Sequence, residues 1–111
     1  MEITTVVNDN IAILMPKGRI DSITANEFDT KITELLDSGQ TKVIIDFSGT
    51  DFISSAGLRI LLLKAKLAKS LKGKIVLSTM SQSISEVFEV SGFSTLFTIF
   101  KTVDAAEKAF M

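Results

Sequence analysis

The spacing of hydrophobic residues along this chain alternates between the two-residue period of a strand and the period of about 3.6 residues of an amphipathic helix. Near the start, two β-branched and aliphatic runs cover residues 2–7 and 11–15. The Asn-Asp-Asn segment at 8–10 between them tolerates the positive φ angles of a tight turn. This pattern predicts a β-hairpin, with Pro16 ending the second strand or lying at a sheet edge.

The next segment, residues 22–38, has helical periodicity. Its apolar residues fall on one face: Phe28, Ile32, Leu35 and Leu36. Thr24 and Glu27 have the spacing of a capping box at the start of this helix. Gly39 is a typical stop signal, so the sequence predicts one helix over this segment.

Predicted strands at 42–47 and 74–78 enclose a second helix, which starts near Ala56 and ends before Gly73. It has two apolar stripes, made of Leu58, Leu61, Leu62, Ala65 and Ala68 on one side and Ile60, Leu63, Leu67 and Leu71 on the other. A surface helix needs only one such stripe. One stripe is therefore expected to lie on the sheet, while the second either packs under a neighbouring helix or meets a partner protein.

The last third contains two short helices and a strand. Ser83 begins a capping box before a helix that ends at Gly92, residues 96–100 form a last strand, and Thr102 can cap a helix over 103–110. The element order is then β-β-α-β-α-β-α-β-α. Strands alternating with helices favour parallel neighbours, while the hairpin adds an antiparallel pair.

The sequence therefore predicts an α/β fold with a mixed, mostly parallel sheet of about five strands and with four helices. A length of 111 residues is enough for one hydrophobic core and too short for two. We expect a single domain that covers residues 1–111.

The composition excludes several classes of chemistry. The chain contains no His and no Cys, which rules out a Ser–His–Asp triad, a thiol nucleophile and zinc sites built on these ligands. A net charge of −1 gives no reason to expect nucleic acid or an acidic membrane surface as a partner. No apolar run has membrane-spanning length and no signal-peptide pattern is present, so we expect no membrane insertion and a cytoplasmic location.

Three carboxylates, Asp21, Asp46 and Asp51, lie near predicted strand ends and could gather at one sheet edge. Such a set can bind Mg²⁺ or act as general acid and base, but turn and cap roles are more common. The glycine spacing before the second helix fits neither a P-loop nor a dinucleotide-binding fingerprint. A receiver domain would also need an acidic pair after its first strand, which is missing here.

Two serines, Ser54 and Ser55, stand directly before the second helix. Unpaired N–H groups and a partial positive charge at a helix N-terminus suit a hydroxyl cap and would also tolerate a phosphate. Ala56 and Gly57 are small, so we expect them to leave the first turn uncrowded and a hydroxyl accessible to another protein. One serine is enough to cap the helix, which leaves the other available for a second role.

The segment from Asp46 to Leu62 resembles the STAS domain of bacterial anti-sigma-factor antagonists. In that family a strand ending in Asp-(Leu/Phe)-Ser is followed by a short turn and (Asp/Ser)-Ser-(Ser/Thr/Ala)-Gly-Leu. This chain has Asp-Phe-Ser at 46–48 and Ser-Ser-Ala-Gly-Leu at 54–58, and Gly-Arg-Ile-Asp-Ser at 18–22 is similar to a further family segment. The element order agrees over essentially the whole chain, so the resemblance implies a STAS-like fold.

The resemblance also implies a partner switch. Unmodified family members bind an anti-sigma factor, which is also a serine kinase of the histidine-kinase-like ATPase fold, and so free its sigma factor. Phosphorylation of the motif serine ends the interaction, and a PP2C-type phosphatase restores it. That serine maps to Ser55, with Ser54, where relatives commonly have Asp, as the second choice and the expected helix cap. The implied partner-binding residues are Asp21, Ser22, Asp51, Ser54, Ser55, Ala56, Gly57 and Arg59.

Two other functions stay open at this level. The chain could be a STAS subunit of a transport or sensory complex, in which the two serines contact a partner without being phosphorylated. An enzyme that uses Asp21, Asp46 and Asp51 is a weaker alternative, because the chain lacks His and a Gly-Lys-Ser/Thr loop. The favoured hypothesis is a regulatory protein without catalysis, cofactor or metal.

Overall fold

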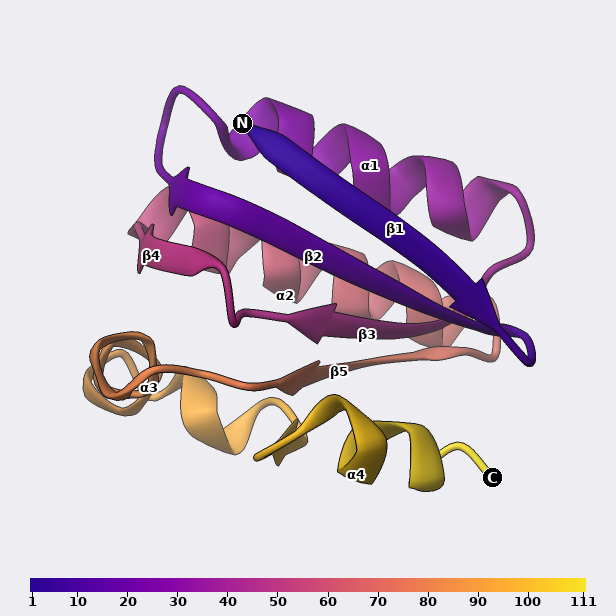
Figure 1. The fold of residues 1–111 in the computed structure, drawn as a ribbon. Helices are drawn as coiled ribbons and strands as arrows, with labels where there is room; N and C mark the ends of the chain where they lie inside the picture. Colours follow the sequence, from indigo (N-terminus) through magenta and orange to yellow (C-terminus); the bar gives the residue numbers. More distant parts are fainter.

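The computed structural model describes residues 1–111, which form one six-stranded sheet with helices on both faces (Figure 1). The elements are β1 (Glu2–Asn8), β2 (Ile11–Ile20), α1 (Ala25–Asp37), β3 (Lys42–Asp46), β4 (Thr50–Ile53), α2 (Ser55–Ser70), β5 (Lys74–Ser78), α3 (Gln82–Val90), a 3-10 turn (Phe93–Thr95), β6 (Ile99–Phe100) and α4 (Val103–Lys108). The strand order is β1-β2-β3-β5-β6, and β4 pairs with the later part of β2. Only β1 and β2 are antiparallel.

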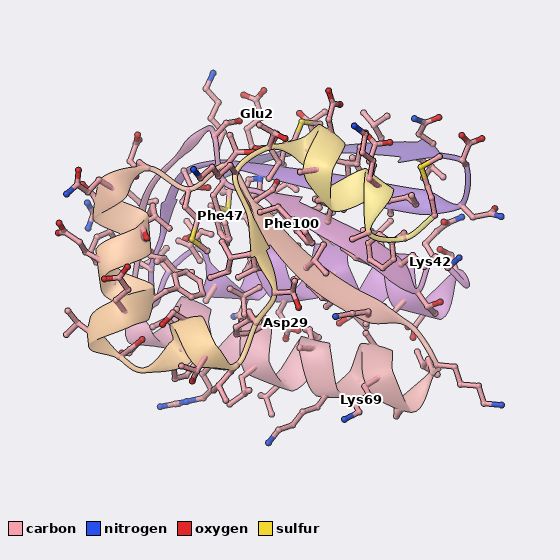
Figure 2. All side chains as sticks on the ribbon, turned by 90° about the horizontal axis from the view of Figure 1, so that it is seen from below. Glu2, Asp29, Lys42, Phe47, Lys69 and Phe100 are labelled. Atoms are coloured by element: carbon pink, nitrogen blue, oxygen red, sulfur yellow. The ribbon has the colours of Figure 1, made fainter.

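The sheet separates a large core from a small one. Side chains of β3 alternate between them, with Val43 and Ile45 in the large core and Ile44 in the small one. The large core has 17 buried residues and lies under α1, α2 and α3, whereas the small core has five and is covered by α4. Figure 2 shows the sheet between α4 and α2, the helix that carries the labelled Lys69.

The predicted fold class is confirmed, and so are the hairpin turn, two glycine stop signals and the cap at Thr102. Asp9 and Asn10 have φ angles of 51° and 68° in the tight turn between β1 and β2. Gly39 and Gly92 follow α1 and α3 with φ angles of 92° and 80°, in the left-handed region that favours glycine. The Thr102 hydroxyl accepts a backbone hydrogen bond at 3.1 Å and caps α4.

The expectation that Pro16 ends its strand or lies at a sheet edge is wrong. Strand β2 continues through it to Ile20 and has neighbours on both sides. The Pro16 carbonyl accepts a hydrogen bond from the Thr50 hydroxyl at 2.8 Å. On the side of β2 to which this carbonyl points, the pairing partner of β2 changes from β3 to β4 near Pro16. No strand backbone needs an N–H from β2 at that point, so proline is tolerated there.

One strand is not predicted from the sequence. The segment expected to be a short turn contains β4, which pairs with β2 through Arg19 with Phe52 and Ile20 with Ile53. The last strand is also shorter than expected, because residues 96–98 are not in a strand and only Ile99 and Phe100 pair with β5. The added strand β4 leads directly into α2.

Neither predicted capping box forms. The Thr24 hydroxyl donates a hydrogen bond to the Arg19 carbonyl at 2.7 Å and makes no cap bond, and α1 begins at Ala25 rather than near residue 22. Ser81, not Ser83, caps α3 and accepts a backbone N–H at 3.2 Å. Each box has the right spacing, but the loop before the helix decides which side-chain oxygen can reach the first N–H groups of the helix.

Helix α2 buries most of one apolar stripe and half of the other. The first stripe lies on the sheet through its buried members, Leu58, Leu61 and Ala68. In the second stripe, Ile60 and Leu67 pack against the large core, whereas Leu63 and Leu71 are 52% and 44% exposed. Even α2, with 16 residues, is too short to cross a bilayer, and no helix is long and apolar enough to do so.

Candidate functional site

The carboxyl ends of β2 and β4 lie side by side and determine the position of the site (Figure 1). Ile20 and Ile53 are paired, and the Ser54 N–H donates a hydrogen bond to the Ile20 carbonyl at 2.8 Å. Parallel strands present their carboxyl ends at the same edge, which is a common place for binding sites in α/β folds. Asp21 and Ser54 each follow their strand directly, so the fold brings them together.

The two serines have different environments. Ser54 is extended, with φ −91° and ψ 172°, and its Oγ accepts a hydrogen bond from the Gly57 N–H at 3.3 Å. Ser54 is therefore the N-cap of α2, as predicted. Ser55 is the first helical residue, one position before the predicted start, and its exposed side chain takes no part in the cap. The first N–H groups of the helix, which have no intrahelical partner, lie next to it.

Gly57 has a structural role that differs from the expected one. It is buried, and a Cβ at this position would lie 2.7 Å from Ile20 Cγ2 and 2.8 Å from Ile53 Cγ1. The missing side chain lets α2 approach β2 and β4 closely and does not keep the hydroxyl of Ser55 accessible. Gly57 faces the core, so a substitution of Gly57 can affect partner binding only by moving α2.

Asp21 organises the loop between β2 and α1. Its Oδ1 accepts hydrogen bonds from the Thr24 N–H at 3.1 Å and the Ile23 N–H at 3.0 Å, and its Oδ2 lies 3.7 Å from Arg19 Nε. The backbone N–H groups of Thr24 and Ile23, and to a smaller extent the Arg19 charge, lower the pKa of Asp21, and partial burial opposes this effect. The ionised carboxylate fixes a loop that leaves Ser22 and Ile23 exposed.

The three carboxylates considered as a metal or acid–base set do not act together. Asp46 is buried and accepts a hydrogen bond from the Ser48 N–H at 2.9 Å, in the turn after β3. Asp51 is exposed on β4 and Asp21 is bonded within its own loop. No group of three or more Asp, Glu, His or Cys side chains is arranged to hold a metal ion.

Two arginines bring positive charge to this edge. Arg59 is exposed and follows Ser55 by four residues, which places the two side chains on the same face of α2. The Arg19 guanidinium lies 4.2 Å from the centre of the Phe52 ring, in addition to its contact with the Asp21 loop. Ala56, between the serines and Gly57, is half-buried.

A groove beside Ser55 adds residues that the sequence did not single out. It has a volume of about 500 Å³, lies between the start of α2 and α3, and is lined by Ser55 and Leu58 together with Ser83, Glu86, Val87 and Val90. Val90, the last residue of α3, is 90% exposed. Ile23, in the loop after β2, is 84% exposed. The only sequence signal for Val90 is that it lies off the buried Ile84–Phe88 face of its helix.

This arrangement presents the Ser55 hydroxyl to another molecule. The chain has no His to accept the proton of the hydroxyl. A phosphate on Ser55 would instead lie at a helix N-terminus with Arg59 one turn away, a setting that favours negative charge. The exposed position of Ser55 is therefore compatible with a phosphate.

Comparisons with known proteins agree over nearly the full length. The family model described as the STAS domain matches residues 2–106. BtrV from Bordetella bronchiseptica, which is named as an anti-sigma factor antagonist, is 34% identical over 110 residues, covering 99% of this chain and 95% of that protein.

Solved structures share the fold. A crystal structure of an anti-sigma factor antagonist from Thermotoga maritima is similar with a TM-score of 0.91 at 21% identity, covering 96% of this chain and 92% of that one. SpoIIAA from Bacillus in its phosphorylated form is similar with a TM-score of 0.75 at 20% identity, covering 99% and 100% of the two chains. From the family match and the relative above 30% identity, the chain belongs to the STAS domain family of anti-sigma-factor antagonists.

Proposed function

We propose that this chain is an anti-sigma-factor antagonist whose partner binding is controlled by phosphorylation of Ser55. The unphosphorylated chain binds an anti-sigma factor and frees its sigma factor, and phosphorylation abolishes this binding. The observation that carries the proposal is the division of roles between two adjacent serines, since Ser54 is used as the helix cap and Ser55 is exposed. The name of the relative BtrV and the phosphorylated form of SpoIIAA support it.

The fold is well placed to accept the phosphate. Phosphoserine adds about −1.5 to −2 charges at neutral pH. A negative charge at a helix N-terminus is stabilised by about 0.3–1 kcal/mol. The exposed Arg59 side chain lies one turn further on the same helix face and can pair with it. The modified chain therefore keeps its structure.

The same charge opposes partner binding. Asp51 is exposed and Asp21 is ionised near the same sheet edge, so a phosphate on Ser55 adds to negative charge already present. It also takes space in the groove between α2 and α3. An acidic or closely packed partner surface is repelled, and the switch acts on the interface while the fold stays unchanged.

The modifying enzymes belong to the proposal as well. The anti-sigma factor is itself a serine kinase of the histidine-kinase-like ATPase fold, and a PP2C-type phosphatase removes the phosphate. This chain supplies the acceptor and the binding surface, without catalysis of its own and without a cofactor. Because sigma factors act in the cytoplasm, the switch is proposed to operate there.

The test uses the anti-sigma factor purified from the source cell, ATP, and site mapping by mass spectrometry. Wild type and Ser54→Ala are expected to accept phosphate on Ser55 and then to dissociate. Ser55→Ala is expected to stay bound without modification, and Ser55→Asp to bind at least about tenfold more weakly.

Two results would redirect the proposal. Full phosphate incorporation into Ser55→Ala would move the switch to Ser54. No binding to the anti-sigma factor and no phosphate on either serine would favour a STAS subunit of a transport or sensory complex.

A further inference from the structure

A second groove lies beside the C-terminal half of α2, away from the site at Ser55. It has a volume of about 540 Å³ and is bounded by α2, the start of β5 and residues 96–98. Its apolar lining comes from all three segments: Leu62, Ala65, Ile75, Leu96 and Phe97. Leu96 is 56% exposed, so part of this apolar surface faces solvent.

Three exposed lysines surround the apolar surface. Lys66 and Lys69 come from α2 and Lys74 from the first residue of β5, and none of them forms an ion pair. On the side of α2 that faces α1, Lys64 is paired with Asp29 at 2.8 Å. Positive charge is thus neutralised on one side of the helix and left free on the other.

This free charge is local and is not explained by the fold alone. The whole chain has a net charge of −1, and α2 contains no acidic residue. The helix dipole accounts for Lys69 in the last turn of α2, but not for Lys74, which lies on a strand. In Figure 2, Lys69 lies on α2, on the opposite side of the sheet from α4.

The shape of the groove favours a protein segment over a small molecule. Small-molecule sites bury most of their ligand, whereas the lysines here are exposed and Leu96 is open to solvent. From Leu62 to Lys69 the groove follows about 10 Å of helix, which equals about two turns of a partner helix. Helix-in-groove recognition uses apolar anchors at i, i+3 or i+4, and i+7 over that length.

We propose that this groove binds an acidic amphipathic helix of a partner protein. Its apolar face lies on Leu62, Leu96 and Phe97, and its carboxylates lie on the three lysines. Ser55 is about 10 Å from Leu62 along α2, in the direction away from Lys69, so this contact does not respond to modification of Ser55. The groove therefore gives the chain a second binding surface beyond the proposed switch.

The probe is a synthetic peptide of about 15 residues with leucine at i, i+3, i+4 and i+7, glutamate at the positions that flank the leucines on the helix, and the strong helix former alanine elsewhere. Titration into the ¹⁵N-labelled full chain is expected to shift the amide resonances of Leu62, Lys69 and Phe97 with a Kd below about 1 mM. Raising the salt concentration from about 0.1 M to about 0.5 M is expected to weaken binding several-fold.

Matched variants separate this groove from general charge effects. The triple variant K66E/K69E/K74E is expected to lose peptide binding, and L96D to weaken it at least about tenfold. The control variant K17E/K101E/K108E reverses three exposed lysines outside the groove and is expected to bind like wild type. Circular dichroism of each variant checks that the fold is intact, and Ser55→Asp is expected to bind the peptide with unchanged affinity.

Several outcomes would overturn the proposal. The first is the absence of resonance shifts at about 1 mM peptide. The second is a set of shifts confined to other surfaces. The third is equally tight binding of a peptide with lysine in place of every glutamate. Equivalent shifts with decanoate alone would assign the groove to a small amphiphile, and self-association lost in K66E/K69E/K74E would assign it to a second copy of the chain. Loss of peptide binding in Ser55→Asp would contradict the independence from the switch. Since the peptide assay needs no phosphate, it remains decisive if the proposed switch fails.

Discussion

At the scale of single residues, the backbone conformation decides which polar group is used inside the fold and which stays free. The extended conformation of Ser54 brings its Oγ to the Gly57 N–H, whereas helical Ser55 presents its hydroxyl to solvent. Thr24 has suitable spacing for a cap but bonds to the Arg19 carbonyl. Spacing in the sequence therefore limits the possible caps, and the preceding loop selects among them.

The two serines should differ in their contribution to stability. Ser54→Ala removes the cap of α2 and is expected to lower the free energy of unfolding by about 1 kcal/mol. Ser55→Ala removes an exposed hydroxyl and is expected to change it by less than about 0.5 kcal/mol. Urea denaturation of both variants checks this, and equal losses would contradict the assignment of the cap to Ser54.

Asp21 should make stability depend on acidic pH. Hydrogen bonds from Thr24 and Ile23 hold its folded-state pKa below the value of about 3.9 expected in an unfolded chain. The ionised carboxylate therefore stabilises the fold above that pH, and the contribution is lost as the pH falls through the folded-state pKa. Asp21→Asn should be less stable than wild type at pH 7, with a difference that closes on acidification.

Urea denaturation between neutral and acidic pH measures this difference. Asp51→Asn is the control, because that exposed side chain makes no comparable hydrogen bonds, and it should follow wild type at every pH. A gap for Asp21→Asn that persists at the lowest pH would show that its cause is not the carboxylate charge.

At the scale of elements, the short strand β4 and the glycine of α2 together place the site. Strand β4 pairs with the end of β2 and carries the chain to Ser54 at the sheet edge. Gly57 then allows the first turn of α2 to pack against Ile20 and Ile53. The positions of both serines depend on this contact.

Substitution of Gly57 tests that packing. In Gly57→Ala, the better helix propensity of alanine contributes about 1 kcal/mol, but overpacking against Ile20 and Ile53 costs about 1–3 kcal/mol. We expect a net loss of about 1 kcal/mol in urea denaturation, together with weaker binding of the anti-sigma factor. Gly49→Ala is the matched control, since its Cβ would meet only ordinary contacts from 3.6 Å, and it should not lose stability. Gly57→Ala with a stability above wild type would contradict the close approach.

At the scale of the whole molecule, features set by neighbouring residues are predictable from the sequence and features set by distant packing are not. The turn at Asp9 and Asn10 has its own local signal, and the motif that resembles the STAS family indicated the fold and the serine that caps α2. Strand β4 has no such signal, because it depends on pairing with β2 and on the bond between Thr50 and Pro16, 34 residues apart. The groove between Ser55 and α3 is invisible in sequence for the same reason.

The central claim is that one phosphate on Ser55 ends partner binding without changing the fold. The most direct measurement compares the affinity of the anti-sigma factor for unphosphorylated chain and for chain phosphorylated on Ser55, by calorimetric titration, with the melting temperature of each form. We predict a loss of affinity of at least about a hundredfold and a melting temperature for the phosphorylated form that is equal or higher. Equal affinities, or a phosphorylated form that loses binding only because it unfolds, would contradict the account.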